Sequence, residues 1–370
     1  MQSTFQLTPA MKALLVFTFF TSTFAQASFL DTPKVKWTHQ LPGSGTLSGR
    51  GLRHGNEVLA SDDDSTLFVT ADDGTLHILS TTTDDNNKSP KSTITYEPEI
   101  LSGTYTESST GVALVHDPST GDIEYVVYAV ADVPVRAGVL YDNLDFNPDR
   151  TSTLSRLLAV NMDGSLRWSI PLNGAVVGKP IVGGKDNDIL YVAHNVPNTE
   201  TPEESATKGQ ISVVLLRSAR PVVTASLAPP NRNGPFGPPA GTKASIDGNQ
   251  LDVIVVSEAW NRGYLSATSS QGNHGGNVYM LKPSSLFDDF NGQGNDAYEL
   301  SLVSDWSLPS VTRPALTRDM EAFFLGATGA SLGGWSDLSG LLEGDEESAS
   351  PTWDVTLEPN KGNASQRELH

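Results

Sequence analysis

The feature that most constrains this chain is a phrase of alternating strands and turns that recurs along most of its length. The clearest copy opens with residues 164–172, around Trp168, and passes through a Gly178-Lys179-Pro180 step. It continues in the runs 189–193 and 209–215. Apolar and polar residues alternate within these runs, and a period of two is that of a β-strand. Convincing helical periodicity is scarce, so the sequence predicts an all-β protein.

Turn residues support this prediction. The runs 66–70 and 75–79 flank Ala71-Asp72-Asp73-Gly74, and an Asp-Gly pair between alternating runs indicates a tight β-hairpin. The 33 glycines and 23 prolines suit many short strands joined by turns. Further strands are predicted at 125–130, 156–160, 189–193, 211–216, 253–257, 277–281 and 322–326.

The recurring phrase predicts a β-propeller. Copies span 36–79, 95–161, 164–215, 222–281 and 306–326, and residues 353–357 look like the opening of a sixth. Propeller repeats run to roughly 40–50 residues, and loop insertions would stretch several of these copies. One blade cannot bury both of its faces, so blades stack radially. Five to six degenerate blades are visible, and the set can be incomplete. A β-sandwich with irregular loops is the alternative.

The phrase resembles the repeat of the pyrroloquinoline-quinone-like (PQQ-like) propeller family. The resemblance rests on a Trp-containing outer strand, a Gly-x-Pro step and a Leu190-Tyr191-Val192 strand, and it extends over about residues 34–326. It implies the propeller fold, in a family that includes quinone-dependent dehydrogenases, outer-membrane assembly lipoproteins and lumenal sensor or scaffold domains. The larger dehydrogenases carry an adjacent cysteine pair and a calcium-ligating acidic set. This chain has no cysteine, so the resemblance points to the non-enzymatic members.

The N-terminus reads as a secretion signal. Lys12 precedes the apolar run 13–20, and small residues at 25–27 form an A-x-A cleavage site. The run is too short for a membrane span. We expect a signal peptide at 1–27, a PQQ-like propeller at 28–340, and at 341–370 an acidic linker with the start of a further blade or a closing strand. The mature protein is expected to be secreted or to enter the secretory-pathway lumen, without membrane insertion.

The charge balance narrows the choice of partners. The formal net charge is −19, and a surface this acidic repels phosphate backbones and anionic headgroups. Nucleic acid is therefore not an expected partner. Divalent cations and basic partners are favoured. Polar insertions, expected to be exposed, lie at 81–91, 133–153, 197–208, 228–242 and 263–276.

One insertion-like segment resembles a calcium loop. Residues 289–296 match the start of the D-x-[DN]-x-[DN]-G pattern, in which alternate oxygens point inward and glycine permits the turn. The candidate ligands for Ca²⁺ are Asp289, Asn291, Gln293 and Asp296. Gln293 is neutral, and Glu299 stands one residue before the place of the bidentate glutamate. The alternative is a solvated polar loop, and no other cofactor is firmly implied.

No catalytic residues are assigned. Gly329-Ala330-Ser331-Leu332-Gly333 matches the G-x-S-x-G elbow, but the only later histidine is the terminal His370, so a blade turn explains it better. The leading hypothesis is a secreted, non-enzymatic binding or scaffold propeller that holds a protein, glycan or ion partner through its inserted loops. The alternative is a quinone- or metal-dependent oxidoreductase of the quinoprotein type. A third reading is a lumenal domain separated from a larger membrane protein.

Overall fold

A computed structural model describes much of the chain. It covers residues 58–83, 89–108, 110–134, 154–200, 207–216, 220–229, 234–246, 249–258, 277–285, 293–304, 313–325, 331–335, 338–339, 342 and 353–356. Over these residues the regular elements are β-strands and one 3₁₀ turn, η5 (Asn295–Ala297). No helix within these ranges is long and apolar enough to span a membrane.

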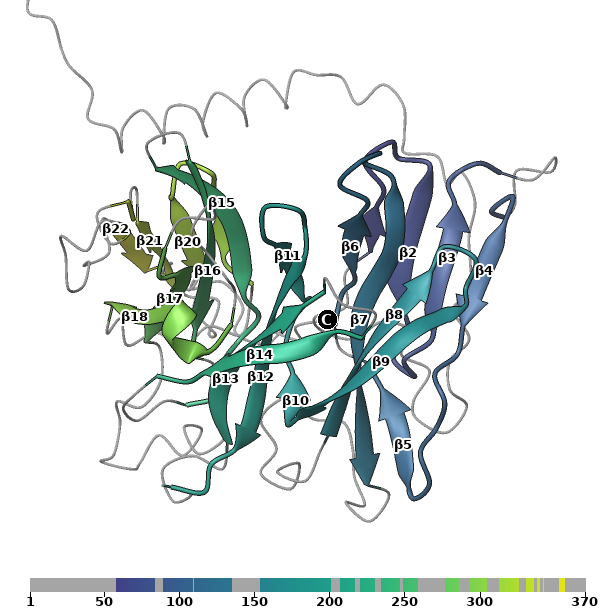
Figure 1. The fold of residues 1–370 in the computed structure, drawn as a ribbon, viewed down its shortest axis with the longest axis horizontal. Coiled ribbons are helices and arrows are strands. Elements are labelled where there is room, and N and C mark those ends of the chain that lie inside the picture. Colours follow the sequence, from purple (N-terminus) through teal and green to yellow (C-terminus); the bar gives the residue numbers. More distant parts are fainter. Residues whose placement is uncertain are drawn as a thin grey trace, which may run out of the picture. The chain divides into compact units, whose positions relative to one another are not determined.

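The strands form five successive antiparallel sheets (Figure 1). Sheet 1 contains β1 (Leu59–Ala60), β2 (Thr66–Thr70), β3 (Leu76–Ser80) and β4 (Thr93–Tyr96). Sheet 2 contains β5 (Thr104–Glu107), β6 (Ala113–His116), β7 (Ile123–Pro134), β8 (Leu154–Asn161) and β9 (Leu166–Asn173). Sheet 3 contains β10 (Ala175–Val176), β11 (Ile181–Gly183), β12 (Ile189–Pro197), β13 (Thr207–Leu215) and β14 (Val222–Leu227).

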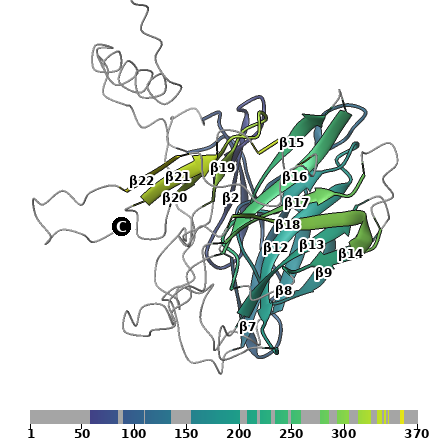
Figure 2. The ribbon, with the colours of Figure 1, turned by 90° about the vertical axis from the view of Figure 1, so that its left-hand side faces the viewer.

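In the last two sheets, too, the strands pair in the order in which they follow along the chain (Figure 2). Sheet 4 contains β15 (Ala240–Ile246), β16 (Asn249–Ser257), β17 (Val278–Pro283) and β18 (Tyr298–Ser304). Sheet 5 contains β19 (Ala315–Leu316), β20 (Ala322–Leu325), β21 (Ser331–Trp335) and β22 (Trp353–Thr356). Each sheet is an antiparallel meander, and in sheets 2 and 3 its first strand consists of two pieces that both pair with the second strand.

The first strand of sheets 2 and 3 is split into two short pieces. β5 and β6 pair with the two ends of β7, and β10 and β11 pair in the same way with β12. In sheet 3 the interruption is the Gly178-Lys179-Pro180 step. Gly178 has φ of 65°, and a Cβ there would lie 2.8 Å from Pro238 Cβ. The step therefore needs glycine both for its backbone conformation and for the close approach of the chain that leads into sheet 4.

Burial on both faces of the second strand explains how the sheets hold together. Leu190 and Val192 of β12 belong to the apolar cluster shared with sheet 2. Tyr191 of the same strand belongs to the cluster shared with sheet 4. In β16, Ile254 packs toward sheet 3, whereas Val253 packs toward sheet 5. Because side chains alternate between faces, one strand serves two neighbours, and its sequence becomes a continuous apolar run.

Four such clusters join the five sheets in chain order. Successive four-stranded meanders packed face to face are the blades of a β-propeller, and the protein has this all-β architecture. The predicted hairpin at Asp73-Gly74 is confirmed by the pairing of β2 with β3. The seven other predicted strands correspond to β7, β8, β12, β13, β16, β17 and β20. Residues 216 and 277 lie just outside β13 and β17, and residue 326 lies outside the described residues.

The sequence phrases and the sheets are offset by one strand. The phrase that opens with Trp168 begins in β9, the fourth strand of sheet 2, and its remaining strands belong to sheet 3. We expected residues 353–357 to open a further blade or to close the ring. Instead β22 pairs with β21 and is the fourth strand of sheet 5. The reason is that each sequence phrase begins with the outer strand of the preceding sheet.

Candidate functional site

Most of the inserted segments connect described strand ends that lie at one end of the sheets. The insertions 133–153, 197–208 and 263–276 lie in the connections from the second to the third strand of sheets 2, 3 and 4. The insertion 228–242 includes the connection from the fourth strand of sheet 3 to the first strand of sheet 4. In a meander these two kinds of connection leave from the same end. We call it the insertion end. The insertion 81–91 joins the third and fourth strands of sheet 1, whose connected ends are at the opposite end.

Sheets 1 and 2 are linked at the insertion end through the Asp72-Gly74 turn. The amide of Ser108 donates to the carbonyl of Asp72 over 3.1 Å. The hydroxyl of Tyr128, which is fully buried, donates to the carbonyl of Gly74 over 2.9 Å. Ser108 and Thr110 also donate their hydroxyls to the carbonyl of Ala129, where the first strand is interrupted. Where the first strand is interrupted, these side chains therefore replace the missing strand as hydrogen-bond partners of the β7 backbone.

A buried histidine links sheets 2 and 3. His194 Nδ1 lies 2.7 Å from the carbonyl of Asn173, and Nε2 lies 2.8 Å from Ser212 Oγ. A carbonyl only accepts, so Nδ1 carries the proton and Nε2 accepts from Ser212. Ser212 Oγ lies 3.0 Å from Ser226 Oγ, which continues the row across β12, β13 and β14. Burial lowers the pKa of His194 from 6.5 to about 4.

An amide side chain of sheet 3 holds the connection that leads into sheet 4. Asn195 Oδ1 accepts from the amide of Phe236 over 2.6 Å, and Asn195 Nδ2 donates to the carbonyl of Phe236 over 3.0 Å. Just beyond β16, Glu258 accepts from the amide of Gly234, the amide of Asn277 and the hydroxyl of Tyr279. Glu258 is 1% exposed, and burial raises its pKa although these hydrogen bonds favour the charged form.

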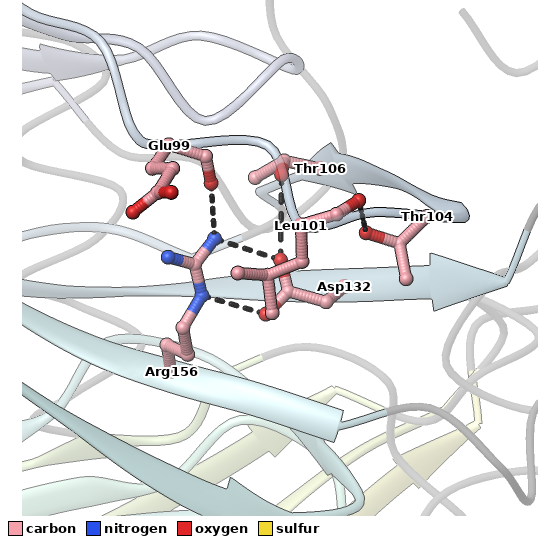
Figure 3. Close-up of polar contacts among 6 residues, drawn as sticks. All are labelled: Glu99, Leu101, Thr104, Thr106, Asp132 and Arg156. Carbon is pink, nitrogen blue, oxygen red and sulfur yellow. Dashed lines mark hydrogen bonds and ion pairs between the residues drawn. The ribbon is translucent and has the colours of Figure 1, made fainter.

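Sheet 2 carries an ion pair at the same end (Figure 3). Arg156 Nε donates to Asp132 Oδ2 over 2.6 Å, and Arg156 Nη2 donates to Oδ1 over 2.8 Å. Arg156 Nη2 also reaches the carbonyl of Glu99 over 2.7 Å, in the chain entering from sheet 1. Thr106 donates its hydroxyl to Asp132 Oδ1 over 3.3 Å. The bidentate pair thus holds the incoming connection against two strands of sheet 2.

The opposite end of sheets 3 and 4 also holds a buried carboxylate. Asp252 Oδ2 accepts from the amide of Gly184 over 2.6 Å and from the hydroxyl of Tyr191 over 2.9 Å. Lys243 Nζ donates to the carbonyl of Gly184 over 2.8 Å. Burial raises the pKa of Asp252 above its ordinary value. These groups fasten sheet 3 to sheet 4.

The predicted calcium loop is described in part. Asp289 and Asn291 lie outside the described residues, and Gln293 and Asp296 are exposed. The main-chain carbonyl of Asp296 accepts from Ser284 Oγ over 2.9 Å. Within the described ranges no three His, Cys, Asp or Glu side chains gather in a way that could hold a metal ion. Calcium binding at Asp289, Asn291, Gln293 and Asp296 stays a prediction.

Three of the described cations bear on the quinone that the oxidoreductase alternative would need. An anionic quinone needs converging Arg, Lys or metal opposite its carboxylates. Arg156 is paired with Asp132, Lys243 donates to Gly184, and Lys282 donates to the carbonyl of Leu342. Each of these cations already holds a protein oxygen, so we derive no reaction step through a quinone. Ser331 of the G-x-S-x-G segment lies in β21, a paired strand.

Comparisons with known proteins concern the fold alone. No protein-family model and no curated protein matches the chain. An oligogalacturonate lyase from Vibrio parahaemolyticus shares 12% identity at a TM-score of 0.41, over 80% of this chain and 65% of that one. A europium-containing methanol dehydrogenase shares 11% at 0.39, over 81% and 61%. The Cps50 (Swd1) β-propeller domain from Myceliophteria thermophila shares 11% at 0.35, over 83% and 87%. The chain spans less than two thirds of the lyase and of the dehydrogenase.

Sequence reasoning did not find the polar residues of the insertion end. Asn195 and Phe236 are 41 residues apart, and only the packing of sheet 3 on sheet 4 brings them together. A signal was nevertheless present. Asp132 interrupts the apolar run of β7 near its end, and His194-Asn195 interrupts that of β12. A polar residue closing an otherwise buried strand marks a group that must find a hydrogen-bond partner.

Proposed function

We propose that this protein is a non-enzymatic propeller that binds a macromolecular partner through the inserted loops at its insertion end. One observation carries the proposal: four of the five polar insertions belong to connections at the same end of the sheets. Loops that tolerate long insertions on a rigid scaffold are where binding surfaces are commonly built.

The hydrogen bonds beneath these loops support the proposal. Asp132 with Arg156, His194 with Asn173, Asn195 with Phe236, and Glu258 with Gly234 fix the strand ends from which the insertions depart. A binding surface gains affinity when its anchor points are already held, because less conformational freedom is lost on association. The buried polar groups are thus a support for the loops rather than the contact surface itself.

The partner class follows from charge and compartment. A net charge of −19 favours a basic protein surface or a glycan without acidic groups over polyanions. We propose that the protein is secreted and that its signal peptide is cleaved after Ala27. A measured mass equal to that of a mature product starting at Ser28 would support this proposal. We also propose that the blades that carry these loops are PQQ-like repeats.

Loop exchange tests the function. Each of the insertions 133–153, 197–208, 228–242 and 263–276 is replaced by a short Gly/Ser linker, and the folded variants are compared on a glycan array and against a panel of basic extracellular proteins. Shortening 81–91 at the opposite end is the matched control. We expect at least one of the four exchanges to remove a ligand that the parent protein and the control variant retain. Equal binding by all five variants, or loss in the control as well, would contradict the proposal.

Calcium is proposed as an accessory ligand at Asp289, Asn291, Gln293 and Asp296. A ligand that binds only the folded state raises the melting temperature. The Asp289→Ala variant should then lose the calcium-induced shift of the parent protein, whereas a shift that persists in the variant would place calcium elsewhere.

A further inference from the structure

The outer strand of a propeller blade has an open edge that can pair with another strand. β14 (Val222–Leu227) is the fourth strand of sheet 3 and pairs with β13 on one side (Figure 1). Its valines are among the most exposed apolar side chains described, with Val222 54% and Val223 38% exposed. An edge of this composition invites strand addition, so its outer side is of interest.

The outer side of β14 is hydrogen-bonded to a turn of the next blade. The amide of Gly294 donates to the carbonyl of Thr224 over 3.1 Å. Asn295 Oδ1 accepts from the amide of Ser226 over 2.9 Å. Thr224 and Ser226 are two residues apart, so both groups point away from β13. In a parallel ladder one partner residue would bond to these same two groups. The turn occupies that position, with a side-chain oxygen in place of a strand carbonyl.

The local conformation of the turn is specified by its sequence. Gly294 has φ of 84° and ψ of 158°, a region that is essentially closed to residues with a side chain. A Cβ there would meet no atom within 4 Å, so the requirement for glycine comes from the backbone alone. Ser284 fixes the other side of the turn, because its amide donates to the carbonyl of Ala297 and its hydroxyl to that of Asp296.

We propose that the turn at residues 293–297 is an edge guard, which blocks the outer edge of β14 against pairing with the same edge of a second copy of this chain. A second copy is the favoured occupant because an identical edge with the same exposed valines can pair with itself antiparallel around a two-fold axis. The guard removes one carbonyl and one amide from the centre of that edge. This proposal does not depend on the partner proposed for the insertion end.

Hydrogen exchange on the unmodified protein gives the first test. The Ser226 amide belongs to an outermost strand but has a partner in Asn295, so we expect it to be protected. Rapid exchange of this amide would overturn the proposal without any mutation. In the Asn295→Ala variant the same amide should exchange faster, whereas Asn295→Asp keeps an oxygen at the same place and should preserve protection.

Self-association gives the second test. Sedimentation of folded Asn295→Ala and Gly294→Ala variants should show dimers or larger species at concentrations where the parent protein shows fewer. Asn173→Ala is the matched control and should behave as the parent protein, because Asn173 is an exposed asparagine of β9 whose contact with His194 is made by its main-chain carbonyl. Adding Val222→Lys to Asn295→Ala should reverse the association, since an edge lysine opposes strand pairing. Association unchanged in both turn variants, or unaffected by Val222→Lys, would overturn the assignment.

Discussion

Arg156 and Arg167 both pair with a carboxylate of sheet 2, yet their surroundings differ. The side chains of Arg156 and Asp132 are 14% and 3% exposed, whereas those of Arg167 and Glu124 are 37% and 40% exposed. A buried pair is costly to break because the remaining charge is left without water. An exposed pair contributes little, because water screens it.

The difference predicts unequal losses of stability. Arg156→Met should lower the free energy of unfolding by about 3–5 kcal/mol, because it leaves the buried Asp132 carboxyl without its cationic partner. Arg167→Met should lower it by about 1 kcal/mol, including the loss of the cation–π contact with the Tyr125 ring at 4.3 Å. Urea unfolding measures both variants. Similar losses for the two would show that the Asp132 pair is hydrated in solution.

His194 predicts a pH dependence. Its pKa is lowered from 6.5 to about 4 in the folded protein, so between these values the unfolded chain binds more protons than the folded one. Stability therefore falls as pH drops through 6.5 toward 4, by up to about 3 kcal/mol. Urea unfolding across this range measures the slope. The His194→Gln variant should be less stable at neutral pH but should lose this part of the slope. An unchanged slope would assign it to other groups.

At the scale of elements, turns test how the sheets are joined. Gly74 has φ of 85°, and a Cβ there would lie 3.0 Å from Val130 and 3.1 Å from Thr106. Gly121 has φ of 78° in a turn with nothing within 4 Å. Gly121→Ala should cost about 1 kcal/mol from backbone strain alone. Gly74→Ala should cost at least about 1 kcal/mol more, because sheet 2 packs against that turn. Equal costs in urea unfolding would contradict this contact.

The sequence predicts the elements unevenly, for physical reasons. β7, β12 and β16 are long apolar runs, so their strands are visible in the sequence, and Asp73-Gly74 identifies its hairpin through turn chemistry. β1 and β10 contain two residues each, too few to show a period. Their place is set by the second strand with which they pair. The hydrogen bonds of the insertion end were not predictable, because residues such as Asn195 and Phe236 meet only after whole sheets have stacked.

At the scale of the whole molecule, the oxidoreductase alternative has a direct test. We expect the purified protein to show no dye reduction with alcohols or aldoses after incubation with pyrroloquinoline quinone and calcium. The reason is electrostatic, because the chain has 24 basic and 43 acidic residues and the cofactor is an anion. In addition, Arg156, Lys243 and Lys282 already donate to protein oxygens. Stoichiometric binding with turnover would reverse the order of the two functional hypotheses.

The one-strand offset between phrase and sheet bears on how such a protein can change length. A segment that starts at β9 and ends at β13 carries one outer strand and the inner strands of the following sheet. Copying or removing a segment with these boundaries leaves four-stranded sheets on both sides of the junction. A segment cut at the sheet boundaries would instead carry no strand of the preceding sheet. The segment that can be duplicated in a gene is therefore shifted by one strand from the segment that folds as a sheet. Each duplicated copy supplies the outer strand of the sheet before it.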